Sequence, residues 1–206
     1  MIRSIQHVGL MLPNPDQATA FYKTFGLEVS ERNGRVIARC AGRDQDQVVV
    51  SEGPNRGLHY VSFAARADEL PATKQRLEQR GVKLEDPPYD GAPQGLWFRD
   101  LDHNLLHIGT EASADSRAAE RVHINTHSTR VRVNERGCLP FGTDPKPIRL
   151  GHIILFSPQP AKQVQFYTEV LGMKISDQVA GGFITFMRGA SDGDHHLVGI
   201  LTSSHP

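Results

Sequence analysis

The pattern of apolar positions near the N-terminus predicts a strand, a helix and three further strands. Residues 7–10 (HVGL) form a short, partly β-branched apolar run, as expected of a strand. After a turn with proline, apolar residues recur at i, i+3, i+4 and i+7, which predicts one buried helical face: Ala18, Phe21, Tyr22 and Phe25. Gly26 follows where a left-handed helix end is expected. Further strands are predicted at residues 27–30, 35–40 and 47–50.

The same pattern returns in the last third of the chain. Residues 7–27 read HVGLMLPNPDQATAFYKTFGL, and residues 152–173 read HIILFSPQPAKQVQFYTEVLGM. His7 matches His152, and Tyr22 matches Tyr167 at the same offset, as expected of a duplicated βαβββ module. The later strands of this copy are predicted at residues 173–176, 183–188 and 196–201.

A more divergent copy fits between these two, at residues 57–110. Residues 59–63 predict its first strand, and residues 68–80 predict its helix, which Gly81 ends. Residues 96–98 and 105–108 predict later strands, with a hairpin turn at 100–104 (DLDHN), because Asp and Asn favour turns. We call the copies up to residue 52, at 57–110 and at 148–206 modules 1, 2 and 3.

The predicted fold class is α+β, built from βαβββ modules. Modules 1 and 2 are expected to form a complete N-terminal domain at residues 1–110, and module 3 the first half of a second domain at 148–206. Residues 111–147 show no periodic apolar pattern and predict a linker or arm, in which 130–133 is a candidate edge strand. A fourth module is expected to be missing.

Composition narrows the class of protein. The 206 residues include 23 Lys and Arg against 23 Asp and Glu, with a pI near 7.2, which argues against a nucleic-acid or polybasic membrane-surface partner. No apolar run is long enough to span a membrane, and the first residues lack the pattern of a secretion signal. Cys40 and Cys138 are expected to be reduced thiols, so a cytoplasmic protein is predicted.

In its order of modules, the chain resembles the vicinal oxygen chelate (glyoxalase/bleomycin resistance/dioxygenase) superfamily, whose domains are cupped mixed sheets made from paired βαβββ modules. Within it, the layout is similar to the type I extradiol ring-cleavage dioxygenases of the catechol 2,3-dioxygenase kind. The matching stretches are residues 149–156 (RLGHIILF), the helix that contains FY and ends at GM, and residues 194–200 (DHHLVGI).

This resemblance implies an oxidoreductase of aromatic catabolism that opens a catechol-type diol with O2. It implies a mononuclear Fe(II) held by two His and one Glu, which leaves coordination positions open for diol and O2. The first ligand maps onto His152, and the other two belong to the family's fourth module, so they are expected to be absent from this chain. We therefore expect no ring cleavage from these 206 residues alone.

The resemblance also assigns a catalytic role to His196. The internal repeat places His196 on the last strand of module 3, where the family has a second-sphere histidine that takes a proton from the diol. His195 is expected to face the opposite way, because adjacent strand residues alternate. The alternative is a solvent-exposed strand start with two solvated imidazoles.

The equivalent positions in the N-terminal domain are His7, Tyr60 and His107, with His59 turned away. This set lacks a carboxylate, and a neutral tyrosine is a poor ligand for a divalent metal at pH 7. A vestigial, structural site is therefore predicted. The alternative is a real metal site that uses His7 and His107.

Two other interpretations of the whole chain stay open. In one, it is a non-catalytic small-molecule or metal-binding protein, similar to glyoxalase or bleomycin-resistance relatives. Two copies of module 3 would then pair across a twofold axis, and a homo-oligomer is expected. In the other, it is an inactive fragment whose module 3 exposes a sheet face and free strand edges.

Overall fold

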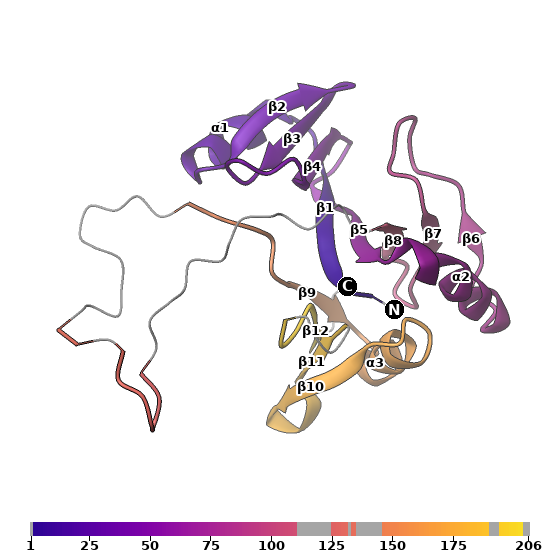
Figure 1. Ribbon diagram of the computed structural model, residues 1–206. Coiled ribbons are helices and arrows are strands. Elements are labelled where there is room, and N and C mark those ends of the chain that lie inside the picture. Colours follow the sequence, from indigo (N-terminus) through magenta and orange to yellow (C-terminus); the bar gives the residue numbers. More distant parts are fainter. Residues whose placement is uncertain (1, 111–124, 132, 135–145, 190–193, 204–206) are drawn as a thin grey trace.

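The computed structural model describes residues 2–110, 125–131, 133–134, 146–189 and 194–203. Module 1 contains β1 (Ser4–Leu12), α1 (Asp16–Thr24), β2 (Glu28–Arg32), β3 (Arg35–Arg39) and β4 (Asp46–Glu52). Module 2 contains β5 (Gly57–Ala65), η1 (Ala67–Glu69), α2 (Leu70–Gln79), β6 (Leu84–Glu85), β7 (Leu96–Arg99) and β8 (Leu105–Thr110). Module 3 contains β9 (Ile153–Ser157), α3 (Pro160–Glu169), β10 (Lys174–Val179), η2 (Ala180–Gly182), β11 (Ile184–Arg188) and β12 (Val198–Thr202). The βαβββ order predicted for modules 1 and 3 is confirmed (Figure 1).

Modules 1 and 2 share one eight-stranded sheet with the order β2-β3-β4-β1-β5-β8-β7-β6. Their first strands meet at its centre, where β1 pairs antiparallel with β5, for example Val8 with Val61. On its other side β1 pairs parallel with β4, and β5 pairs parallel with β8. The two copies therefore join edge to edge through equivalent strands.

Module 3 forms a separate four-stranded sheet with the order β10-β11-β12-β9. This order repeats β2-β3-β4-β1 of module 1, including the parallel pairing of the first and last strands. Within the described residues, β9 pairs with a strand on one side only, whereas its equivalent β1 pairs on both. The free edge of β9 thus corresponds to the edge at which modules 1 and 2 join.

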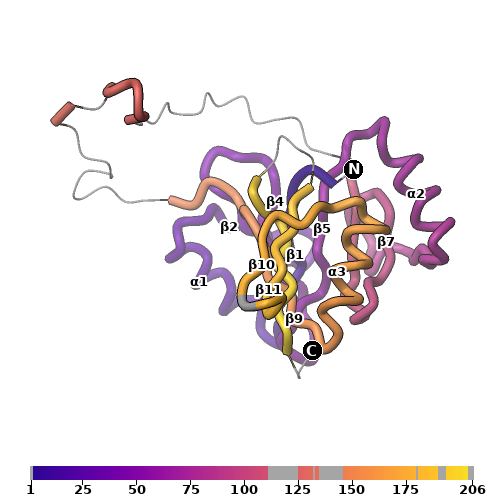
Figure 2. Tube along the Cα trace, turned by 90° about the horizontal axis from the view of Figure 1, so that it is seen from below, coloured from indigo at the N-terminus to yellow at the C-terminus, as the bar shows by residue number. Residues whose placement is uncertain are grey.

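A continuous apolar core joins module 3 to module 2. Leu77 and Phe98 of module 2 belong to the same buried cluster as Phe166, Tyr167 and Val170 at α3. In Figures 1 and 2, α3 lies between the strands of the second sheet and module 2. The helix side of module 3 is therefore covered, and the opposite face of its sheet is turned outward.

A polar contact lies within this apolar interface. The hydroxyl of Tyr167, which is fully buried, donates a hydrogen bond to Asp100 Oδ2 at 3.1 Å. Asp100 also accepts hydrogen bonds from the backbone N–H groups of Asp102 and Asn104 and from the Asn104 amide. These bonds confirm the predicted turn at residues 100–104, in which His103 adopts a positive φ of 64°.

The linker prediction can be compared with the structure only in part. Residues 125–131 contain a turn closed by the hydrogen bond from Thr126 N–H to Thr129 C=O. The predicted edge strand at 130–133 was wrong for residues 130, 131 and 133, which are described and form no strand. Cys138, Arg132, His123 and most of 111–147 lie outside the described residues, and the domain limits stay a prediction. Within the part of the chain that is described, no helix is long and apolar enough to cross a membrane.

Candidate functional site

His152 and His196 lie side by side at one end of the second sheet. His152 directly precedes β9, and His196 stands two residues before β12. Because these strands pair in parallel, with Ile153 opposite Val198, the residues that precede them become neighbours. A hydrogen bond from Ile153 N–H to Leu197 C=O extends the pairing to this end. The two imidazole centroids are 4.5 Å apart, so the structure brings together the predicted metal ligand and the predicted catalytic residue.

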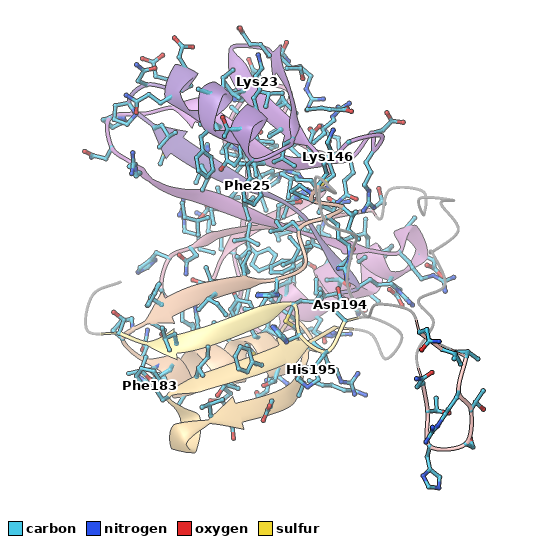
Figure 3. All side chains as sticks on the ribbon, turned by 90° about the vertical axis from the view of Figure 1, so that its left-hand side faces the viewer. Lys23, Phe25, Lys146, Phe183, Asp194 and His195 are labelled. Atoms are coloured by element: carbon cyan, nitrogen blue, oxygen red, sulfur yellow. The ribbon has the colours of Figure 1, made fainter. Side chains whose placement is uncertain are left out.

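The placement of His195 differs from the expectation. His195 Nδ1 lies 3.2 Å from His196 Nδ1, so the two side chains touch instead of facing opposite ways. Strand alternation does not apply here, because β12 begins at Val198 and both histidines precede it. Figure 3 shows His195 and Asp194 at one end of the second sheet and Phe183 at the other. The expectation that His196 lies on the strand itself was wrong for the same reason.

The surroundings of His196 favour its neutral form. Its pKa is lowered mainly by partial burial, and also by the neighbouring imidazoles of His152 and His195, while Asp194 acts in the opposite direction. Asp194 is itself engaged with Arg149, whose two terminal nitrogens lie 2.5 and 2.6 Å from the carboxylate oxygens. A neutral imidazole at this position is able to accept a proton or to offer a nitrogen lone pair.

Apolar side chains cover the sheet face next to these histidines. Phe186 on β11 lies 4.7 Å from His196, centroid to centroid, and Phe156 on β9 is 54% exposed. Gly199 on β12 lies between Phe186 and Ile154, and a Cβ there would stand 2.4 Å from Ile154 and 3.3 Å from Phe186. The missing side chain therefore lets Ile154 and Phe186 close over the strand as an apolar surface beside the two imidazoles.

The described residues do not supply a complete metal site. Two imidazoles are adjacent, but among the described residues no group of three His, Cys, Asp or Glu side chains is placed to hold a metal ion. His152 and His196 therefore do not form a complete ligand set of two histidines and one carboxylate within the described residues. The nearby carboxylate of Asp194 is occupied by Arg149.

In the N-terminal domain, His7 and Tyr60 are in direct contact. His7 Nε2 lies 3.1 Å from the Tyr60 hydroxyl, which lies 2.9 Å from the hydroxyl of Tyr89. Tyr60 reaches this position across Gly9, where a Cβ would be only 2.3 Å from its ring. Burial lowers the pKa of His7 to about 4 and raises that of Tyr60. His7 and Tyr60 are therefore both neutral at pH 7.

His107, the third position of that set, is committed to protein partners. Its Nδ1 lies 2.8 Å from Ser62 Oγ and its Nε2 lies 3.2 Å from the Gln94 carbonyl. It is fully buried, which lowers its pKa to about 4. With both ring nitrogens engaged, His107 is better suited to structural support than to metal binding. His59 lines a different cavity, together with Arg99 and His103.

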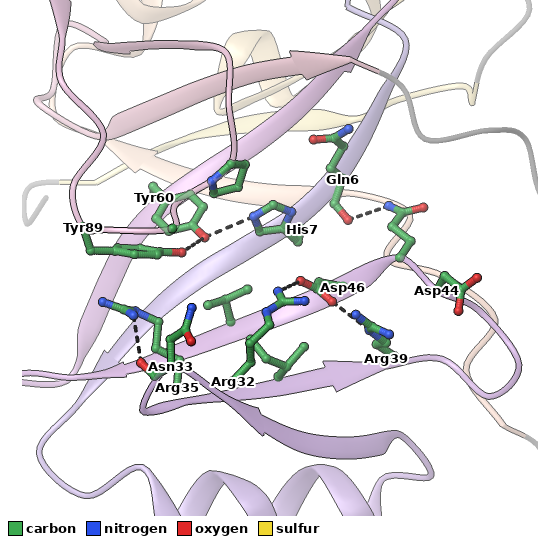
Figure 4. Close-up of a pocket in the computed structure, with 15 residues that line it drawn as sticks. Gln6, His7, Arg32, Asn33, Arg35, Arg39, Asp44, Asp46, Tyr60 and Tyr89 are labelled. Atoms are coloured by element: carbon green, nitrogen blue, oxygen red, sulfur yellow. Dashed lines mark hydrogen bonds and ion pairs between the residues drawn. The ribbon is translucent and has the colours of Figure 1, made fainter.

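Sequence reasoning missed the cavity that His7 and Tyr60 line. It measures about 310 Å³, and charged residues of module 1 and aromatic residues of module 2 surround it (Figure 4). Its charged lining residues are Arg32, Arg35, Arg39, Asp44 and Asp46. The signal was present in the sequence, since Arg35, Ile37 and Arg39 alternate along β3 and so share one face of the sheet.

Comparisons with known proteins agree with this architecture. The family model of the Glyoxalase/Bleomycin resistance protein/Dioxygenase superfamily matches residues 4–108 and 149–206. Metapyrocatechase 2 of Cupriavidus necator is 30% identical over 208 residues, which cover 98% of this chain and 62% of that relative. The chain thus spans less than two thirds of the length of this curated relative.

Two solved structures show the same fold. The Mn(II)-bound glyoxalase from Novosphingobium aromaticivorans has a TM-score of 0.71 at 24% identity, over 98% of this chain and 63% of that one. The 2,2',3-trihydroxybiphenyl 1,2-dioxygenase from Sphingomonas wittichii also has a TM-score of 0.71, at 18% identity, over 98% of this chain and 68% of that one. Both likenesses extend over all three modules.

Proposed function

Because the chain belongs to the Glyoxalase/Bleomycin resistance protein/Dioxygenase superfamily, we propose that it carries one metal ligand, His152, and one proton-transferring residue, His196, of an extradiol ring-cleavage site. The substrates of this proposed function are a catechol-type diol and O2. The observation that carries it is the contact between His152 and His196 on the outward face of the second sheet. The similarity to a metapyrocatechase over nearly the whole chain supports the same assignment.

In this proposal His152 is a ligand of Fe(II). Its side chain is exposed at the end of β9, so an imidazole nitrogen is accessible from the open face. Bound Fe(II) would supply the activation of the diol and of O2. Since the described residues provide no complete ligand set, we derive no step through the metal.

His196 is assigned the proton transfer. Its imidazole borders both His152 and the apolar surface formed by Ile154 and Phe186, on which an aromatic ring can lie flat. Its lowered pKa keeps it neutral at pH 7, so it is ready to accept a proton from a diol hydroxyl. His195 contacts His196 and would orient its ring.

The test is anaerobic loading with Fe(II), followed by catechol and O2, with oxygen uptake and absorbance of the ring-opened product recorded together. The intact mass of the native gene product is measured first. A product heavier than 22.8 kDa is expected to open the ring, and a product of 22.8 kDa is not. Ring opening by the 22.8 kDa chain alone would contradict the proposal that this chain lacks some of the metal ligands.

Variants separate the two histidines wherever turnover is found. We expect His152→Ala to lose bound iron and activity together. We expect His196→Gln to retain iron but to lower kcat roughly 100-fold, the usual contribution of a positioned general base. His103→Gln, in the turn between β7 and β8, is the matched control. Turnover that survives both His152→Ala and His196→Gln would refute the proposal.

For the alternative of a non-catalytic binding protein, we propose that copies of this chain associate through the free edge of β9. The support is the equivalence of β9 and β1, since β1 gains a second partner when the modules of the first sheet pair. An antiparallel pair of β9 strands would place His152 of two chains close to one twofold axis. Light scattering at micromolar concentration tests this, and a monomer would refute it.

The proposal places the protein in the cytoplasm, with a diol and O2 as its small-molecule partners and no nucleic-acid or membrane partner. The neutral overall charge supports it. Cell fractionation is the measurement, and recovery of the protein with the membrane pellet or with nucleic acid would contradict this placement.

A further inference from the structure

The cavity at the centre of the first sheet carries an excess of positive charge. Arg32, Arg35 and Arg39 line it together with only two carboxylates, Asp44 and Asp46. Arg32 and Arg39 both bind Asp46, with Arg39 Nε 2.7 Å from its Oδ1. Asp44 is exposed at the surface. Asp46 is thus shared between two guanidinium groups, and within the described residues Arg35 has no carboxylate partner.

Arg35 is held firmly without an acidic partner. Its Nε donates to Ser51 Oγ at 3.2 Å and its Nη1 donates to the Asn33 carbonyl at 3.0 Å. The guanidinium carbon lies 3.6 Å from the centroid of the Tyr89 ring. Within the described residues Arg35 forms no ion pair with a carboxylate. A guanidinium fixed in this way is pre-organised to bind a planar anion such as a carboxylate.

Part of the remaining wall suits a flat, uncharged ring, beside the polar side chains of Gln6, Asn33 and Gln45. Ile37 and Val49 line one side, and Tyr60 and Tyr89 contribute aromatic rings and hydroxyl groups. Burial lowers the pKa of His7 and raises that of Tyr60, so neither of these two groups adds a charge at pH 7. A cavity of about 310 Å³ is at the small end of ligand sites, which fits a molecule with a single ring.

We propose that this cavity binds a small aromatic monocarboxylate. Its carboxylate pairs with Arg35, and its ring packs among Ile37, Val49 and Tyr60, which line the cavity. Figure 4 shows Arg35 and Tyr60 at this cavity. The inference goes beyond the proposed ring cleavage and uses neither His152 nor His196. It predicts that the first sheet is a ligand-binding domain in its own right.

Trp97 provides a built-in reporter. It is the only tryptophan of the chain, and its indole N–H donates to the Pro93 carbonyl at 3.1 Å. Its ring lies 5.0 Å from that of Tyr60, centroid to centroid, and both Pro93 and Tyr60 line the cavity. Occupation of the cavity is therefore expected to change Trp97 fluorescence.

The experiment titrates the purified chain with benzoate, followed by Trp97 fluorescence and by calorimetry. We expect saturable binding with one site per chain. Benzamide, the neutral analogue of the same shape, is expected to bind roughly tenfold more weakly, because it loses the charge-assisted hydrogen bonds. Cyclohexanecarboxylate tests the preference for a flat ring. No saturable benzoate binding up to millimolar concentration, or equal binding of benzamide, would overturn the proposal.

Variants locate the site. Arg35→Gln is expected to weaken benzoate binding about tenfold or more. Arg56→Gln, at an exposed position outside the cavity, is the matched control and should leave binding unchanged. Arg35→Lys keeps the charge without the planar fork, so it should bind more weakly than wild type even if Arg35→Gln is poorly folded. Equal weakening in Arg56→Gln and Arg35→Gln would indicate surface adsorption and refute the site.

Discussion

The hydrogen bond between Tyr167 and Asp100 is predicted to hold module 3 on module 2. Replacing Tyr167 with Phe removes only the hydroxyl and leaves the buried ring in place. Asp100 Oδ2 has two side-chain donors in the wild type, the Tyr167 hydroxyl and the Asn104 amide. In the variant only the Asn104 amide, at 3.0 Å, remains. A hydrogen bond to a charged acceptor contributes about 1.5–3 kcal/mol, so Tyr167→Phe should lower the free energy of unfolding by that amount.

The effect should depend on pH with a definite sign. Burial raises the pKa of Asp100, and the bond from Tyr167 opposes that rise. A bond to the ionised carboxylate is stronger than one to the neutral acid. The deficit of Tyr167→Phe is therefore expected to be largest at pH 7, where Asp100 is ionised, and smaller once acidic pH protonates it.

Urea unfolding of both proteins, at pH 7 and at acidic pH, measures this deficit. The internal repeat offers a matched control, since Tyr22 occupies the equivalent helix position in module 1 and is only half-buried. Tyr22→Phe should change stability by no more than about 0.5 kcal/mol. Equal losses in the two variants, or no loss in Tyr167→Phe, would show that the reasoning about the interface is wrong.

Two further predictions concern the N-terminal domain. The pKa values of His7 and His107 are lowered to about 4 by burial, so as pH falls below 6.5 the unfolded chain takes up protons first and stability declines. At pH 5 the loss should be about 2 kcal/mol per histidine, and denaturation curves that coincide at pH 7 and pH 5 would contradict this. Gly9→Ala should destabilise by about 1–3 kcal/mol, because the new Cβ would meet the Tyr60 ring. Gly57→Ala, where a Cβ meets nothing within 4 Å, is its control in the same thermal melt, and equal effects would refute the steric argument.

Local pattern was enough to predict the modules and their order. The internal repeat and the Asp- and Asn-rich turn at 100–104 each depend on residues close together in sequence. The predicted burial of one helical face in module 1 was wrong in part, because α1 buries Ala18 but leaves Phe21 and Phe25 exposed. The pairing of His152 with His196 was also predictable, since the repeat places them at the starts of strands that lie together. The features that could be predicted from the sequence are therefore those formed within a single module.

Contacts between modules were not predictable in the same way. The bond from Tyr167 to Asp100 joins residues 67 positions apart, and no periodic pattern connects them. The Arg35 cavity arises only when Tyr89 of module 2 folds over β3 of module 1. The predicted orientation of His195 was wrong because it assumed strand alternation at a residue that precedes the start of β12. The first two contacts join residues far apart in sequence, and the third depends on where β12 begins.

The central claim is that the metal-facing site lies at His152 and His196 on the second sheet. The most direct test is to find which of the ten histidines binds a metal ion at the lowest concentration. Imidazole resonances of the labelled protein are recorded by NMR while Mn(II) is titrated in, since its paramagnetism broadens nearby nuclei even when binding is weak. The account predicts that His152 and His196 broaden at the lowest Mn(II) concentrations, while the buried His7 and His107 stay sharp. Broadening of His7 and His107 first, or of all histidines alike, would contradict the placement of the metal-facing site on the second sheet.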